Sequence, residues 1–315
     1  MRSKKGGGKR RSIPTGSRPE RVTPAKVRNA IFSIAEDKLR RYDGRAAGIK
    51  FNKLVFSIHL AFSKASNPNL HFTLPYRWYL YGAVVDTAEL GGVIEIDHEE
   101  DEMRSTVRYR GEKPHIDTSV REEIERICDR FCEKYPRTDR YDDMLRENYR
   151  SAKLDFQRSF LEWNLLVQDM KHGSVEISNT LLRRYLIDLQ HDFPEDLEPR
   201  LEPGFRRLAI YIEGLLSRPS SLRMNEVKLI ENLMWEFWSV FCLFLSIKYN
   251  EDISQRRLAG YRSRSEEELR AYKRRLDTFL VEAYLKDDKE GLDDESLKTL
   301  SSLLESRIVH TMEEE

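Results

Sequence analysis

From Thr118 onward the sequence carries almost only the apolar spacing of α-helices, and this pattern constrains the fold more than any other feature. One stripe comprises Ile124, Ile127, Cys128 and Phe131. A longer stripe predicts a single helix over about 139–170, because its apolar residues recur three or four positions apart. Further helices are predicted at 179–192, 204–217, 224–249, 266–285 and 295–312. Residues 116–315 are therefore expected to form a helical bundle.

The region at 23–115 mixes helix and strand signals. A hydroxyl cap followed by proline, Thr23-Pro24, predicts a helix to about Arg41, and a second helix is expected over 49–63. Alternation over 74–81 predicts an extended strand, after which Gly82 is expected to turn the chain into a short helix over 83–90. Two strands, 93–97 and 103–110, flank a hairpin loop. This order predicts a winged-helix-like module ahead of the bundle, in a mainly α fold.

Charge is concentrated at the start of the sequence. Residues 1–22 hold eight basic residues and one acid, whereas the whole protein is balanced at 54 basic and 54 acidic residues. A glycine- and proline-containing segment with so little to bury is expected to be a disordered tail. Its Lys4, Lys5, Lys9, Arg10 and Arg11 are candidates for contacts with nucleic-acid phosphates. The alternative is a tail that only aids solubility.

Composition restricts the class of protein. Apolar residues make up 39% of the sequence, which is enough for a core, and three cysteines exclude a disulfide scaffold. The basic start is not followed by the apolar run of a secretory signal. The most apolar window, 233–247, is shorter than a membrane span and predicts a buried helix. These features favour a cytoplasmic protein without a membrane segment.

Known catalytic and cofactor motifs are missing from the sequence. Cys128 and Cys132 lie one helical turn apart without a nearby histidine, so they are expected in the core, as is Cys242. The hairpin loop holds carboxylates over 97–102 that could bind Mg²⁺, but a solvated loop explains them as well. We therefore expect no enzyme, no metal and no cofactor.

The module lacks the donors of a DNA-reading helix. Its predicted third helix carries Asp86 and Glu89 and no Arg, Lys, Asn or Gln, which would repel a duplex. A protein partner fits these acids better, and neighbouring aromatic residues could anchor it unless they belong to the core. The candidate partner-binding residues are Tyr76, Trp78, Tyr79, Tyr81, Asp86 and Glu89.

A second basic stretch, at 256–275, supports an alternative function in nucleic-acid binding together with the tail. It interleaves basic residues with Tyr261 and Tyr272, as single-strand binders do, although a solvated helix face would have the same composition. Its candidate residues are Arg256, Arg257, Arg262 and Arg264.

Two segments of the module match short family patterns. KFNKLVF at 50–56 is similar to K-L-x-K-L-[LV]-[YF], and WYLYGA at 78–83 is similar to W-x-x-Y-G-P, with Ala83 in place of the proline. Over about residues 49–90 the sequence thus resembles the Panacea (SocA-like) antitoxin domain. The resemblance implies a domain that neutralises or tethers a partner protein, in toxin–antitoxin or phage-defence settings, and carries over no catalytic residue. The expected function is therefore a non-enzymatic regulatory or interaction protein.

Overall fold

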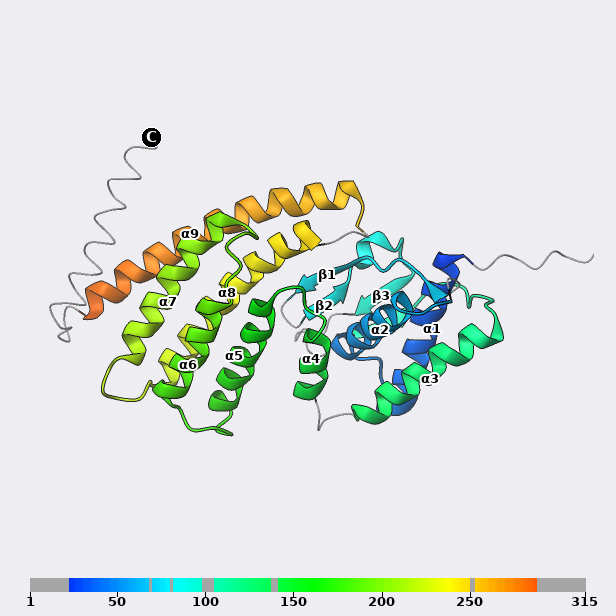
Figure 1. Ribbon diagram of the computed structural model, residues 1–315, viewed down its shortest axis with the longest axis horizontal. Coiled ribbons are helices and arrows are strands. Elements are labelled where there is room, and N and C mark those ends of the chain that lie inside the picture. Colours follow the sequence, from blue (N-terminus) through cyan, green and yellow to red (C-terminus); the bar gives the residue numbers. More distant parts are fainter. Residues whose placement is uncertain are drawn as a thin grey trace, which may run out of the picture.

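The computed structural model describes residues 23–67, 70–79, 82–97, 105–136, 141–249 and 253–287. Within these residues the protein is mainly helical, with two small antiparallel sheets of two strands each. The strand-containing region forms one end of an elongated molecule, and the helices of the second half lie side by side at the other (Figure 1). The tail candidates Lys4, Lys5, Lys9, Arg10 and Arg11 and the predicted helix at 295–312 lie outside the described residues.

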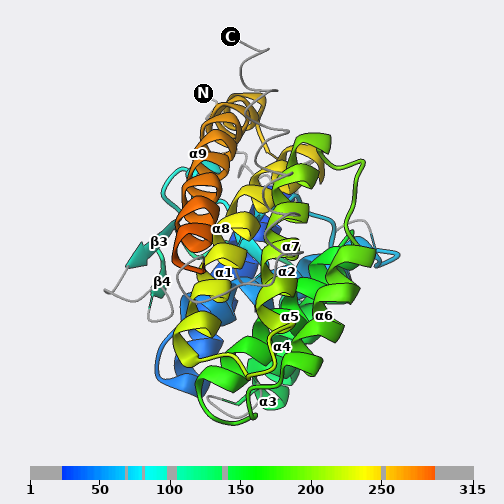
Figure 2. The same cartoon turned by 90° about the vertical axis from the view of Figure 1, so that its left-hand side faces the viewer.

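The N-terminal region begins as predicted. α1 (Pro24–Asp43) is capped by Thr23, whose Oγ1 accepts from the Lys26 N–H at 3.3 Å, and ends at Gly44 with φ +77°. α2 (Gly48–Ser63) follows and is buried over six consecutive residues from Phe51 to Phe56. β3 (Ile94–Asp97) and β4 (Thr106–Tyr109) pair as the predicted hairpin, on the side of the molecule away from α5 and α6 (Figure 2). The loop at 98–102 lies outside the described residues.

The short helix predicted over 83–90 is wrong. The backbone forms β1 (Tyr76–Tyr79) and β2 (Gly82–Val85), which pair antiparallel, and then a single 3-10 turn, η2 (Thr87–Glu89). Val84 and Val85 are β-branched residues that favour a strand. The Asn52 amide fixes β2, because its Oδ1 accepts from the Val85 N–H at 2.9 Å. The described residues therefore lack the third helix of a winged helix at this position.

Gly82 permits this strand pair, and we expect Gly82→Ala to lower the free energy of unfolding by about 2–4 kcal/mol. Its φ is +97°, and an added Cβ would lie 2.9 Å from Tyr149 Cε2 and 3.0 Å from Lys53 Nζ. The matched control is Gly173→Ala, where φ is +73° and nothing lies within 4 Å, so that only backbone strain is added. Urea denaturation measures both variants. Equal losses in the two would contradict the crowding at Gly82.

The single helix predicted over 139–170 is also wrong, because the backbone breaks into α4 (Tyr141–Tyr149) and α5 (Asp155–Lys171). Arg146 and Glu162 form an ion pair at 2.9 Å, although a continuous helix would hold them about 24 Å apart. Side chains satisfy the backbone at the break: Gln157 Oε1 accepts from the Leu154 N–H, and Arg158 donates to Ala152 O. The apolar period continues across the break, so the sequence pattern did not reveal it.

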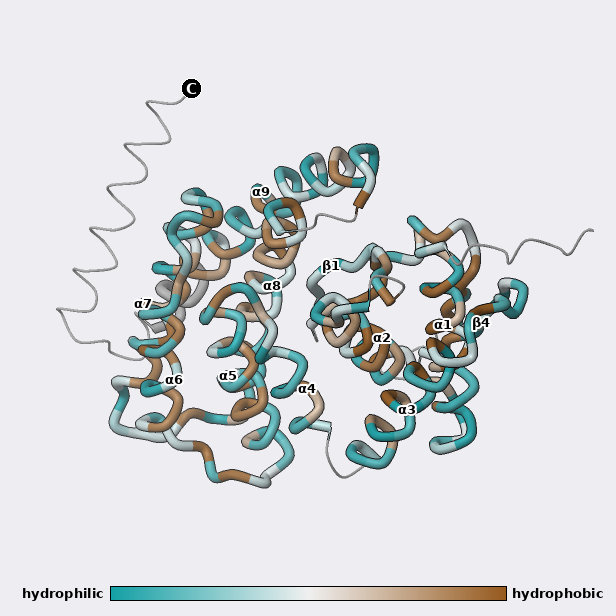
Figure 3. Tube along the Cα trace, turned by 45° about the vertical axis from the view of Figure 1, so that its right-hand side comes forward, coloured by the Kyte–Doolittle hydropathy of each residue, from teal (hydrophilic) through white to brown (hydrophobic). Residues whose placement is uncertain are grey.

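The other predicted helices that fall within the described residues are formed in the predicted order, and two begin earlier than expected. They are α3 (Thr118–Lys134), α6 (Asn179–His191), α7 (Glu202–Leu216), α8 (Met224–Tyr249) and α9 (Gln255–Asp287), with a 3-10 turn η4 (Pro199–Leu201) before α7. α9 lies along α8 in both ribbon views (Figures 1 and 2). α2 and α8 are rich in hydrophobic residues, whereas α3 and α9 are largely hydrophilic (Figure 3).

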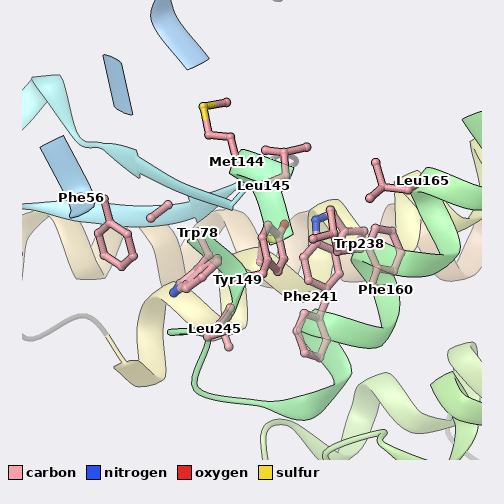
Figure 4. Close-up of a cluster of buried hydrophobic side chains, with 14 of the residues drawn as sticks. Phe56, Trp78, Met144, Leu145, Tyr149, Phe160, Leu165, Trp238, Phe241 and Leu245 are labelled. Atoms are coloured by element: carbon pink, nitrogen blue, oxygen red, sulfur yellow. The ribbon is translucent and has the colours of Figure 1, made fainter. Parts of the chain in front are cut away.

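One continuous core joins the N-terminal region to the bundle. Phe56 and Tyr149 both contact the Trp78 ring, and Phe160 stacks on Trp238 with centroids 4.0 Å apart (Figure 4). α3, the first predicted bundle helix, packs against α1. The two predicted parts of the protein therefore share their apolar interior, which sets their relative position.

The three cysteines lie in this core, as predicted. Cys128, Cys132 and Cys242 are buried free thiols, and burial raises the pKa of each, for Cys132 to about 11. Among the described residues, α8 is the one helix that is long and apolar enough to cross a membrane, and 72% of its apolar window is buried inside the protein.

Candidate binding cavity

A cavity of about 230 Å³ lies where the N-terminal strands meet the start of α9. Its walls come from α2, β1, β2, the turn η2, β3 and the first turn of α9. The lining residues that bear on its chemistry are Asn52, Lys53, Arg77, Tyr79, Asp86, Ala88 and Arg257. The cavity therefore joins segments that are far apart in the sequence.

Asp86 is bound inside the molecule. Its carboxylate is 3% exposed and accepts from Arg257 Nε at 2.9 Å, from Arg257 Nη2 at 3.2 Å and from the Tyr261 hydroxyl. The hydrogen bond that Arg257 donates to Asp86 raises the pKa of Arg257. Burial raises the pKa of Tyr261 to about 12, with a smaller contribution from the hydrogen bond that its hydroxyl donates to Asp86. Asp86 thus ties the end of β2 to α9.

Glu89 makes a second contact with the same end of α9. Its Oε1 accepts from Ser254 Oγ at 2.7 Å, and the same hydroxyl oxygen accepts from the Arg257 N–H at 3.3 Å. The expectation that Asp86 presents negative charge to a partner therefore needs correction, because this residue is buried against Arg257. For Glu89, whose described contact is with the neutral Ser254 hydroxyl, it stays a prediction. Both carboxylates are engaged by residues of the same molecule, and the short helix that was to display them is not formed.

Lys53 is the most unusual residue in the cavity wall. It is 1% exposed, and within the described residues it has no ion pair and donates one hydrogen bond, to Ala83 O at 3.1 Å. Burial lowers the pKa of its amine from the ordinary 10.5 to about 7. The amine therefore titrates near neutral pH.

Arg77 and Tyr79 lie on the cavity face of β1. The Arg77 guanidinium lies 4.6 Å from the centroid of the Tyr79 ring, and it makes no ion pair within the part of the protein described here. The strand predicted at this position is confirmed, and its alternation explains the arrangement: Trp78, between them, faces the core and is 3% exposed.

The four aromatic candidates therefore occupy different places in the structure. Trp78 is a core residue, and half-buried Tyr76 packs edge-on against Phe56 with centroids 4.9 Å apart. Tyr79 lines the cavity, and Tyr81 lies outside the described residues. Only Tyr79 among them is placed at the candidate site.

Three of the eight basic residues in the stretch at 256–275 form ion pairs with acids of the same molecule. Arg257 binds Asp86, Arg264 lies 3.5 Å from Glu268, and Arg275 pairs with Glu236 at 2.9 Å. Arg256 and Arg262 are exposed. Of the nucleic-acid candidates in this stretch, Arg257 alone lines the cavity.

Sequence reasoning passed over Lys53 and Arg77 as site residues. Lys53 stood only inside the family-like segment, although a lysine that directly precedes the apolar run Leu54–Phe56 is itself a signal, because buried lysines are rare. The described residues contain no cluster of three or more His, Cys, Asp or Glu side chains that could hold a metal ion. Most of the acidic loop at 97–102 lies outside them.

Comparison with known proteins does not add to this geometry. No family model, curated protein or solved structure matches the sequence. The site must therefore be interpreted from its own chemistry.

Proposed function

We propose that this protein is a non-enzymatic interaction protein that binds a partner protein by admitting one anchoring side chain into the cavity. The size of the cavity carries this proposal. About 230 Å³ is smaller than the roughly 300–1,000 Å³ of most small-molecule sites, and a single side chain fills such a pocket. Binding energy at protein interfaces commonly comes from a few such anchors.

The lining supports binding rather than catalysis. The described lining includes no histidine and no cysteine, and its one carboxylate, Asp86, is held by Arg257 and Tyr261. An antitoxin-like or defence-related role and a cytoplasmic location remain part of the proposal. So does the winged-helix-like character of 23–115, for which α1, α2 and the hairpin β3–β4 supply elements.

Nucleic-acid binding remains the alternative, and the described residues give it less support. Arg257 and Arg264 already face Asp86 and Glu268, which lowers the positive potential that a phosphate backbone would meet. The tail, which carries the rest of that prediction, lies outside the described residues.

Closing the mouth of the cavity tests the proposal. Ala88 is exposed and lines the cavity, so Ala88→Trp fills the mouth while leaving the core intact. We expect tagged wild-type protein to recover a stoichiometric partner from lysate of its own source cells, and Ala88→Trp to recover at least about tenfold less, equivalent to 1.4 kcal/mol. Quantitative mass spectrometry measures the recovery.

The matched control is Ala61→Trp, which places the same side chain at an exposed position of α2 outside the cavity lining. This variant should recover the partner like the wild type. A partner recovered equally by all three proteins would exclude the cavity as the docking site, and repeated recovery of no stoichiometric protein would contradict the proposed function itself.

A further inference from the structure

We infer that the anchoring residue of the partner is acidic, an aspartate or glutamate whose carboxylate enters the cavity and binds Arg77 and the Lys53 amine. The inference rests on the proposed function and adds the chemistry of the partner. Its basis is the charge of the described cavity wall, in which three basic side chains face one carboxylate.

The single carboxylate does not balance these cations. Asp86 accepts two hydrogen bonds from Arg257 and one from Tyr261, so its oxygens are directed at α9. Arg77 and Lys53 have no carboxylate partner in the described part of the protein. An anion that enters the cavity would supply one, and charge-assisted hydrogen bonds in a poorly hydrated site are among the strong ones.

Lys53 makes the cavity selective for an anion. A neutral ligand leaves the buried amine with one backbone acceptor, Ala83 O, whereas a carboxylate adds a charged one. The Arg77 guanidinium carbon lies 4.6 Å from the centroid of the Tyr79 ring. Its planar N–H donors therefore belong to the same cavity wall.

The wall favours the carboxylate of an aspartate or glutamate over the terminal carboxylate of a polypeptide. Capture of a C-terminus relies on free backbone N–H groups. Two N–H groups of the wall are already used, because that of Val85 donates to Asn52 Oδ1 at 2.9 Å and that of Asp86 donates to Pro75 O at 2.7 Å. Arg77 and Lys53 add side-chain donors, which suit a carboxylate carried on a flexible stem.

The test uses a capped glutamate, N-acetyl-glutamate α-methylamide, whose only charge is its side chain. We expect saturable shifts of the Val85, Asp86 and Thr87 amide signals in ¹H–¹⁵N spectra of the full-length protein, with a Kd on the order of 1 mM. Arg77→Gln and Lys53→Met should each weaken binding at least about tenfold, or 1.4 kcal/mol. Arg262→Gln, on the exposed face of α9, is the matched control and should bind like the wild type.

Three comparison probes keep the assignment falsifiable: the capped glutamine of the same shape, N-acetylglycine as a C-terminal carboxylate, and inorganic phosphate. Binding of the capped glutamine as tightly as the capped glutamate would overturn the charge argument. Tighter binding of N-acetylglycine or phosphate would overturn the assignment to an acidic residue. If no probe binds while wild-type protein still recovers a partner, this inference fails and the proposed function stands.

Binding of the capped glutamate should also weaken as pH rises from 6 to 9. The bound carboxylate favours the protonated amine, so above pH 7 binding must include protonation of Lys53. In Lys53→Met this dependence should disappear. The other charged or titratable groups of the cavity lining, whose contributions the variant separates, are Arg77, Tyr79, Asp86 and Arg257, and Tyr149 lies beside the amine at Gly82. An unchanged pH profile in the variant would contradict the role of Lys53.

Discussion

Asp86→Ala is expected to lower the free energy of unfolding by about 2–4 kcal/mol and Tm by about 5–10 °C. The substitution removes the acceptor of Arg257 and of the Tyr261 hydroxyl, and Tyr261 is 5% exposed, so its hydroxyl has little access to replacement water. The first turn of α9 should then lose its hydrogen bonds to the end of β2. Calorimetry measures Tm, and hydrogen–deuterium exchange should show faster exchange at 255–262.

Two further variants identify the source of that loss. Arg257→Ala with Asp86→Ala should cost little more than Asp86→Ala alone, because both remove one interaction. Arg264→Ala breaks only the exposed pair with Glu268 and should change stability by less than about 0.5 kcal/mol. If the effects of Asp86→Ala and Arg257→Ala simply add, the two side chains are not coupled and the link between β2 and α9 is not the cause.

Lys53→Met is expected to stabilise the protein by about 2–4 kcal/mol at pH 7. Methionine has a similar shape without the charge, and the loss of the hydrogen bond to Ala83 O offsets only about 1 kcal/mol. The unfolded lysine titrates near 10.5 and the folded one at about 7, so between these values the unfolded state binds more protons. The stability of the wild type therefore rises with pH across this window.

The difference in stability between the wild type and Lys53→Met isolates the contribution of the buried amine. The advantage of Lys53→Met should be fully present below pH 7 and should decline as pH rises toward 10.5, above which the wild-type amine becomes neutral in both states. Urea denaturation at several pH values measures it. Lower stability of Lys53→Met at pH 7 would mean that the amine is charged and paired in the folded protein, contrary to its surroundings.

Sequence periodicity predicted the elements whose apolar face is continuous. α8 was predicted with the boundaries that it has, because its apolar residues recur at helical spacing from Met224 to Tyr249. The same reasoning joined α4 and α5, because a break that preserves the apolar phase does not change the pattern. It also made Ala83–Val85 a helix, because the tertiary contact that fixes β2, from Asn52 to Val85, joins positions 33 residues apart.

The candidate site was less accessible to sequence reasoning for a related reason. Asp86 and Arg257 are 171 residues apart, and their opposite charges suggest two separate surfaces, one for a protein and one for nucleic acid. Only the packing of α9 over the strands reveals that they neutralise each other. The same packing shows that Lys53 and Arg77 are the cations of the described cavity wall that lack a carboxylate.

The position of Arg257 gives the cavity a consequence beyond recognition. One guanidinium both lines the cavity and holds Asp86, so the occupancy of the cavity and the docking of the last described helix share a single group. Any ligand that attracts Arg257 must shift the detachment equilibrium of that helix, and detachment must shift ligand affinity by the same factor. Such reciprocity would allow detachment of α9 to change the affinity of the cavity for its ligand.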